Sequence, residues 1–151
     1  MSNSHDWTRR RFLKTAAAGA LGTSLLGRMR RAEATVEAAE VADIFEGSRG
    51  VTLTFNMQHG PFPCRGSSYR DNRTFVFVPH HFRLPASDRV DTVVHFHGHN
   101  TTAEEAMERH ELREQFYDSC QNGILVMPQG PDNAEDSSGG NLDREDGFLD
   151  F

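Results

Sequence analysis

Runs of apolar residues in the second and third thirds of the chain predict four β-strands. Residues 51–57 alternate between apolar and polar side chains with the period of two that is typical of a strand. Residues 74–79 are β-branched and aromatic, which predicts a better buried strand. The nearly continuous apolar run at 92–97 predicts a strand covered on both faces, and 124–128 predicts a short buried strand. These four runs supply the expected sheet.

The segments between and after these strands predict a helical crossover and a long loop. Thr101 and Glu104 have the spacing of a capping box, which predicts a helix from there to about Ser119. Residues 129–146 are polar and contain several glycines, so we expect a loop, and 146–151 resembles the first turn of another helix. The order predicts an α/β fold with parallel strands and a ligand site at their carboxyl ends.

The chain begins with a cationic segment and a short, weakly apolar run at 15–26, which is too short to span a bilayer. Its motif is similar to the twin-arginine translocation signal at every defined position. The matching residues are Thr8, Arg9, Arg10, Phe12, Leu13 and Lys14. The resemblance implies a signal peptide over 1–34, the twin-arginine translocase as a partner, and a periplasmic or extracellular destination without a permanent membrane anchor. Residues 35–49 then read as a polar tail or a short loose helix.

Charge and length limit what the remaining 117 residues can do. Beyond residue 34 the sequence has nine arginines, no lysine and twenty acidic residues, hence a net charge of −11. Such a surface repels phosphate backbones, so we expect no nucleic-acid partner. The length suits one small domain or part of one. Cys64 and Cys120 could form one disulfide in an oxidising compartment, and the sequence leaves this open.

Three histidines at alternate positions invite a hypothesis of metal binding. His95, His97 and His99 would share one face of a strand, where three imidazoles could bind zinc and leave one coordination position open. Gly98, however, is expected to end the strand and turn His99 away. This weakens the hypothesis, and a small exported metal-binding protein that uses these three histidines is kept as the alternative function.

The segment from Val93 to Asn100 resembles the strand and His-Gly turn of α/β-hydrolases, where the turn forms half of the oxyanion hole. The match falls on His97 and Gly98, with the backbone amide of His99 as the expected donor. The resemblance extends over 73–79, 126–131 and 146–148, as in polyhydroxybutyrate depolymerases and feruloyl esterases. It implies the amino-terminal part of a serine-dependent hydrolase acting on small-molecule esters, with no cofactor.

One departure from that family limits the expected activity. A Gly-x-Ser-x-Gly nucleophile elbow occurs nowhere in the 151 residues, and Ser137-Ser138-Gly139-Gly140 is only a partial likeness. The expectation is therefore a truncated α/β-hydrolase domain over 50–151, with about four strands and one crossover helix. It would lack the catalytic serine, acid and histidine and would be inert by itself.

Overall fold

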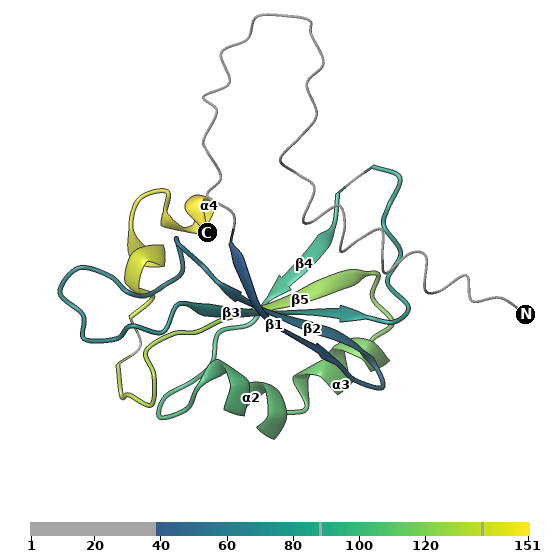
Figure 1. Cartoon of the computed structure of the whole chain (residues 1–151), viewed down its shortest axis with the longest axis horizontal. Coiled ribbons are helices and arrows are strands. Elements are labelled where there is room, and N and C mark those ends of the chain that lie inside the picture. The colour runs from purple at the N-terminus through teal and green to yellow at the C-terminus, as the bar shows by residue number, and fades with distance from the viewer. Residues whose placement is uncertain (1–38, 88, 137) are drawn as a thin grey trace, which may run out of the picture. The chain divides into compact units, whose positions relative to one another are not determined.

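The computed structural model describes residues 39–87, 89–136 and 138–151, all of which belong to the unit of the chain that starts at Val36. The predicted signal peptide and its motif lie outside these residues. The described part forms a five-stranded sheet in the order β1-β2-β3-β5-β4 (Figure 1). The strands are β1 (Glu40–Glu46), β2 (Gly50–Asn56), β3 (Arg73–Pro79), β4 (Asp91–Val94) and β5 (Gly123–Pro128). The helices are α2 (Ala103–Arg109), α3 (Leu112–Asp118), the 3-10 helix η1 (Gly140–Asp143) and α4 (Gly147–Asp150).

The sheet is mixed, and only its last pair has the predicted parallel arrangement. β4 and β5 are parallel and are joined by the α2–α3 connection, which is the βαβ crossover that the sequence predicted. β1, β2, β3 and β5 pair in antiparallel fashion along the rest of the sheet. The α/β class is confirmed, with five strands in place of the four expected and with antiparallel pairs on one side.

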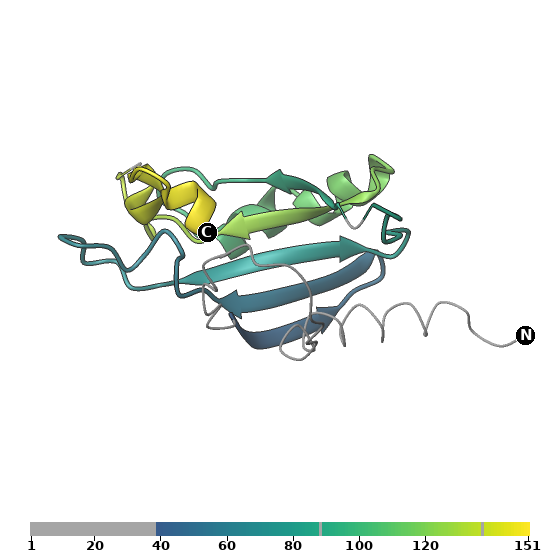
Figure 2. The same ribbon diagram turned by 90° about the horizontal axis from the view of Figure 1, so that it is seen from above.

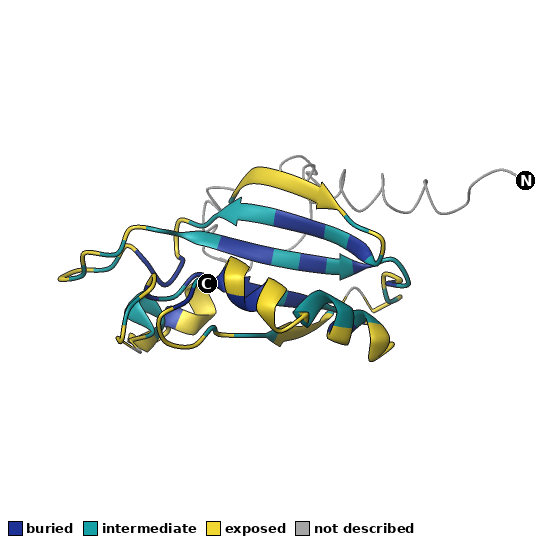
Figure 3. Cartoon of the chain, turned by 90° about the horizontal axis from the view of Figure 1, so that it is seen from below, coloured by how far each residue is buried: buried dark blue, intermediate teal, exposed yellow. Residues whose placement is uncertain are grey.

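One face of the sheet packs against α2 and α3 to form the hydrophobic core (Figure 3). Four side chains of β3 and β5 meet three from the helices, and each large apolar side chain contributes about 1.5–3 kcal/mol when it is buried. The core residues are Phe75, Phe77, Leu125 and Met127 from the strands and Ala103, Met107 and Phe116 from the helices. Within the described ranges, no helix has the length and apolar character needed to cross a membrane.

The predicted polar tail at 35–49 is wrong, because most of it forms β1. Every residue of β1 is exposed, and the strand pairs with β2 through a register irregularity between Val41 and Asp43. Val41 lies opposite Phe55 and Ile44 lies opposite Leu53, so the extra residue puts Val41 and Ile44 on one face. Since these two residues are three positions apart, the bulge conceals the period-two signal of a strand.

The single predicted helix from Thr101 to Ser119 is divided in two. Glu111 adopts a left-handed conformation with φ of 50°, and this residue separates α2 from α3. The capping box lies one position later than predicted. The Thr102 hydroxyl accepts from the amide of Glu105, whose carboxylate accepts from the amide of Thr102, both at 3.1 Å.

A second pair with capping-box spacing, Thr101 and Glu104, has other partners. Thr101 is buried, and Glu104 extends away to form an ion pair with Arg73 at 3.3 Å. The sequence contains both pairs. Because Thr101 is buried, Thr102 and Glu105 form the capping box of α2.

The prediction that the run 92–97 is a strand covered on both faces is wrong. β4 ends at Val94 and occupies an edge of the described sheet, where Val93 is 50% exposed. The apolar run predicts the strand correctly, but it does not show which other elements lie beside or over that strand. In the same described region, Cys64 and Cys120 are free thiols, so they do not form a disulfide.

Two threonines with opposite surroundings provide a test of these energetics. Thr52 is 4% exposed and its hydroxyl has no hydrogen-bond partner, so Thr52→Val should raise the free energy of unfolding by about 1 kcal/mol. Thr102 caps α2, so Thr102→Val should lower it by about 1 kcal/mol. Urea unfolding followed by circular dichroism measures both. Equal losses from the two substitutions would contradict the assignment of an unsatisfied hydroxyl to Thr52.

Candidate functional site

A pocket of about 400 Å³ lies at the carboxyl ends of the parallel strands β4 and β5. Its walls come from the turn 97–99 after β4, from 130–131 after β5, from the loop 136–143 with one gap at 137, and from Phe148 of α4. The carboxyl ends of parallel strands are where open α/β sheets place their ligands. The pocket therefore occupies the position that the sequence predicted for a site.

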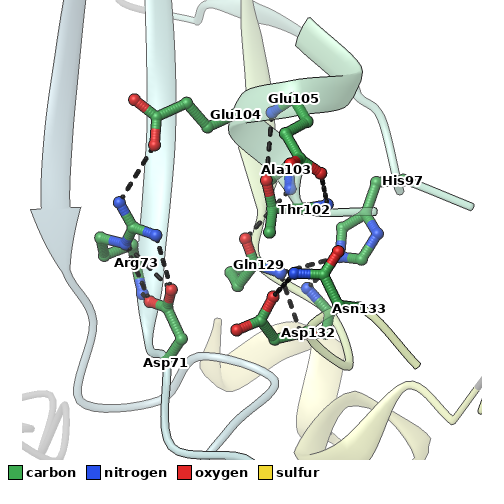
Figure 4. A network of polar contacts seen from close by, with 11 residues as sticks. Asp71, Arg73, His97, Thr102, Ala103, Glu104, Glu105, Gln129, Asp132 and Asn133 are labelled. Atoms are coloured by element: carbon green, nitrogen blue, oxygen red, sulfur yellow. Dashed lines mark hydrogen bonds and ion pairs between the residues drawn. The ribbon is translucent and has the colours of Figure 1, made fainter. Parts of the chain in front are cut away.

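The imidazole of His97 joins the turn after β4 to the chain after β5 (Figure 4). Its Nε2 atom accepts from the backbone amide of Gly130 at 2.9 Å and lies 3.0 Å from the side-chain nitrogen of Gln129. Its Nδ1 atom lies 2.9 Å from the carbonyl oxygen of Gly98. Both ring nitrogens are thus engaged within the protein.

The partners of Gln129 determine which nitrogen of His97 carries the proton. Gln129 is fully buried, and its Oε1 atom accepts from the amide of Ala103, the first residue of α2, at 3.0 Å. The amino group of Gln129 must then face His97, so Nε2 of His97 is the acceptor and Nδ1 carries the hydrogen. Nδ1 donates this hydrogen to the carbonyl of Gly98. A doubly protonated His97 would have no acceptor for Gln129 or Gly130.

Backbone hydrogen bonds fasten the same turn to the loop after β5. The amide of Asn100 donates to the carbonyl of Ala134 at 2.9 Å, and the amide of Asn133 donates to Thr101 at 3.3 Å. Asn100 adopts φ of 49°, a left-handed conformation that asparagine tolerates better than most residues. The turn is therefore held from both its ends, by His97 and by residues 100–101.

Arg73 links β3 to this assembly through both its side chain and its backbone. Its carbonyl accepts from the amide of Gln129 at 2.9 Å, and its guanidinium lies between Asp71 at 2.7 Å and Glu104 of α2 at 3.3 Å. Burial by itself would raise the pKa of Asp71, but the hydrogen bonds and the charge of Arg73 outweigh it and lower that pKa. At neutral pH, Asp71 therefore supports Arg73 as a carboxylate.

The far wall of the pocket is held by the segment that begins η1. The side chain of Asn141 donates to the carbonyls of Gly60 and Pro63 at 3.0 and 2.9 Å. Gly140 adopts φ of 60°, and a Cβ atom there would lie 2.2 Å from the carbonyl of Pro61. Only glycine fits at this contact. The loop after β2 and the loop after β5 therefore close together around the pocket.

Two carboxylates in the pocket wall bind loop amides. Asp136 accepts from the amide of Ser138 at 2.7 Å, and Asp143 accepts from the amide of Gly139 at 2.8 Å. The Ser138 hydroxyl accepts from the amide of Gly140 at 3.0 Å and lies 3.4 Å from Asp143. These bonds make a tight polar turn, and they give Ser138 neither a strand-to-helix elbow nor a histidine partner among the described residues.

The structure does not gather His95, His97 and His99 into a metal site. Among the residues with described positions, no three histidine, cysteine or acidic side chains are placed to bind one ion. His97 is committed to Gly98 and Gly130, and His95 belongs to the face of β4 that carries the helices, since Val93 on that face pairs with the core residue Leu125. Burial lowers the pKa of His95, and the charges of His110 and His97 act in the same direction.

The predicted turn residues His97, Gly98 and His99 do line the pocket together. A Cβ atom added to Gly98 would meet nothing within 4 Å, so this glycine borders open space. Gln129, which holds the turn, was missed as a functional residue, although it stands between Pro128 and Gly130 in the matched segment. The available signal in the sequence was a glutamine directly after an apolar strand. Its burial, which makes it informative, is not visible in a sequence.

Comparisons with known proteins leave the chain without a family assignment. No protein-family profile, no curated protein and no solved structure matches it. The assignment of a function therefore depends on the geometry of the pocket and its turn.

Replacing the buried amide should loosen the turn. Gln129→Leu leaves the amide of Ala103 without a partner and removes one of the two donors to Nε2 of His97, so the free energy of unfolding should fall by about 1–3 kcal/mol. Long-range ¹H–¹⁵N spectra of the wild type should show the hydrogen of His97 on Nδ1. The exposed Gln121→Leu is the control and should change neither measurement. A wild-type His97 protonated on Nε2 would refute the network.

Proposed function

We propose that this chain is the amino-terminal part of an exported serine-dependent α/β-hydrolase that acts on an ester. The turn 97–99 would provide half of the oxyanion hole. The observation that carries the proposal is the position of this turn: it lies in the loop from a parallel strand to its crossover helix and lines the pocket. A backbone amide in such a strand-to-helix loop is the second donor of the oxyanion hole in α/β-hydrolases.

The rigidity of the turn supports this assignment. An oxyanion hole works because its donors are already in place before charge develops on the substrate. Here His97 holds Gly98 and Gly130, and Gln129 holds His97 against the start of α2. A Cβ atom added to Gly98 would meet nothing within 4 Å, so there is room for a substrate beside this turn.

The charges of the pocket disfavour an anionic substrate. Asp136 and Asp143 contribute two carboxylates, and no arginine or lysine is present among the lining residues. An anionic substrate would meet repulsion in this setting. The apolar side chains of Phe96, Leu142 and Phe148 offer contacts to the acyl or alcohol part of a neutral ester.

The nucleophile, its acid and its base are assigned to sequence outside residues 1–151. These residues contain no Gly-x-Ser-x-Gly elbow, and Ser138 lies in a polar turn with amide and carboxylate partners. The chain by itself should therefore not hydrolyse esters. No observation favours the alternative of metal binding by His95, His97 and His99, whose side chains are not gathered.

The esterase proposal is tested on a gene product that extends past Phe151 and contains a serine elbow. It should hydrolyse p-nitrophenyl acetate, while residues 1–151 should not exceed the background rate. His99→Pro removes the proposed donor and should lower kcat by about 10²–10³-fold. His99→Ala keeps the backbone amide and should retain most of the activity.

Thermal unfolding midpoints serve as the control for folding of both variants. Activity that survives His99→Pro in a folded enzyme would contradict the role of the turn. Hydrolysis that survives loss of the elbow serine but requires a metal ion would contradict the proposed enzyme class.

Export by the twin-arginine translocase is part of the proposal and has its own test. Residues 1–38 fused to a fluorescent protein that folds in the cytoplasm should deliver fluorescence to the periplasm. Arg9→Lys with Arg10→Lys should abolish this delivery, because these positions match the invariant pair of the signal. Arg11→Lys changes the variable position and should leave delivery intact. Equal export by all three fusions would remove the assignment.

A further inference from the structure

Acidic side chains cover the described part of the molecule far more densely than basic ones. Eighteen acidic residues have described positions, sixteen of them are exposed and none is buried. The same ranges contain nine arginines, and lysine does not occur in the sequence beyond Lys14. The folded chain therefore concentrates negative charge at its surface, and such charge repels itself across the compact state.

The arginines do little to neutralise this charge. Within the described ranges, two of the nine form ion pairs with acidic side chains. These are Arg49, which pairs with Asp118, and Arg73, which pairs with Asp71 and Glu104. Three others bind uncharged groups, namely backbone carbonyls or an aromatic ring; they are Arg70, Arg83 and Arg113. Most of the exposed carboxylates in these ranges thus make no ion pair.

The acidic residues are spread over separate parts of the molecule. β1, at one edge of the sheet, carries three, residues 103–118 of the helical crossover carry six, and residues 132–150 carry seven with one arginine. Figure 2 shows β1 along its edge of the sheet and η1 and α4 beyond the ends of the strands. A basic partner would dock on one patch, so this spread favours a general response to salt over a single docking surface.

The fold itself holds several carboxylates close to one another. Glu104 and Glu108 lie one turn apart on α2, where like charges destabilise a helix. Asp136 and Asp143 both accept from backbone amides of the turn 138–139, and both line the pocket. Salt weakens the repulsion between such groups, since the Debye length falls from about 10 Å at 0.1 M to about 3 Å at 1 M.

We propose that folding of this chain depends on concentrated salt, because its exposed and largely unpaired carboxylates repel one another until dissolved cations screen them. Folded domains have a small margin of stability, so repulsion summed over many carboxylates is large enough to decide whether the compact state forms. The dependence is a property of the described fold and its surface. It goes beyond the proposed esterase function and stands whether or not the chain belongs to a hydrolase.

Thermal unfolding of the full chain at rising salt concentration tests this dependence. The unfolding midpoint, followed by circular dichroism, should rise by about 10 °C between about 0.1 and 1 M sodium chloride. Sodium, potassium and tetramethylammonium chloride should act alike at equal ionic strength, because screening does not distinguish between them. The product extended past Phe151 is measured in parallel, so that a chain that needs its continuation to fold still gives a result.

Charge variants separate this screening from the effect of salt on apolar surface. Neutralising three carboxylates outside the ion pairs should raise the midpoint by about 4–8 °C at 0.1 M and change it little at 1 M. Neutralising three carboxylates inside ion pairs changes the net charge equally but removes an attraction, so it should lower the midpoint at low salt. The first variant is Asp43→Asn with Glu108→Gln and Glu145→Gln, and the matched control is Asp71→Asn with Glu104→Gln and Asp118→Asn.

Three outcomes would overturn the dependence on salt. The first is the absence of any salt-dependent gain in folded structure or in the midpoint, in both the chain and its extended product. The second is an equal shift from the two triple variants, because the ion pairs would then make no difference. The third is full stabilisation by micromolar calcium without added sodium chloride, because this would indicate a specific cation site in place of general screening.

Discussion

The candidate site depends on the hydrogen bonds that the buried side-chain amide of Gln129 makes. An amide without partners in the protein interior costs about 1–3 kcal/mol for each unsatisfied group, so its partners must be in place whenever the chain is folded. Those partners are the first amide of α2, the ring of His97 and the carbonyl of Gly130. One side chain thereby fixes where the crossover helix begins, which tautomer His97 adopts and how closely the two strand-end loops approach.

The loops after β4 and β5 are held to each other, because the contact between His97 and Gly130 constrains both of them. A Cβ atom at Gly130 would lie 3.0 Å from Nε2 of His97, so the close approach that lets the Gly130 amide donate also disfavours any other residue there. Residues 100 and 133 add backbone bonds on the far side of the turn. A turn held in this way keeps its amides in fixed directions, which an oxyanion hole requires.

The sequence predicted what local patterns encode and missed what depends on neighbours. The strands at 74–79 and 124–128 were correct, because β-branched and aromatic runs have strong local preferences. β1 was missed because a bulge breaks the period of two. One continuous helix was predicted in place of α2 and α3, because the left-handed conformation of Glu111 has no sequence signature. Gln129 escaped notice because its role comes from burial and from two long-range partners, Ala103 and His97.

The position of β4 and the geometry of the candidate site are physically connected, because the chain passes directly from this strand into the turn that lines the pocket. The chain leaves β4 at Val94, His95 makes one more bond to β5, and two residues later His97 enters the network of Gln129. The turn at 97–99 therefore starts from backbone that hydrogen bonds to β5 already hold in place.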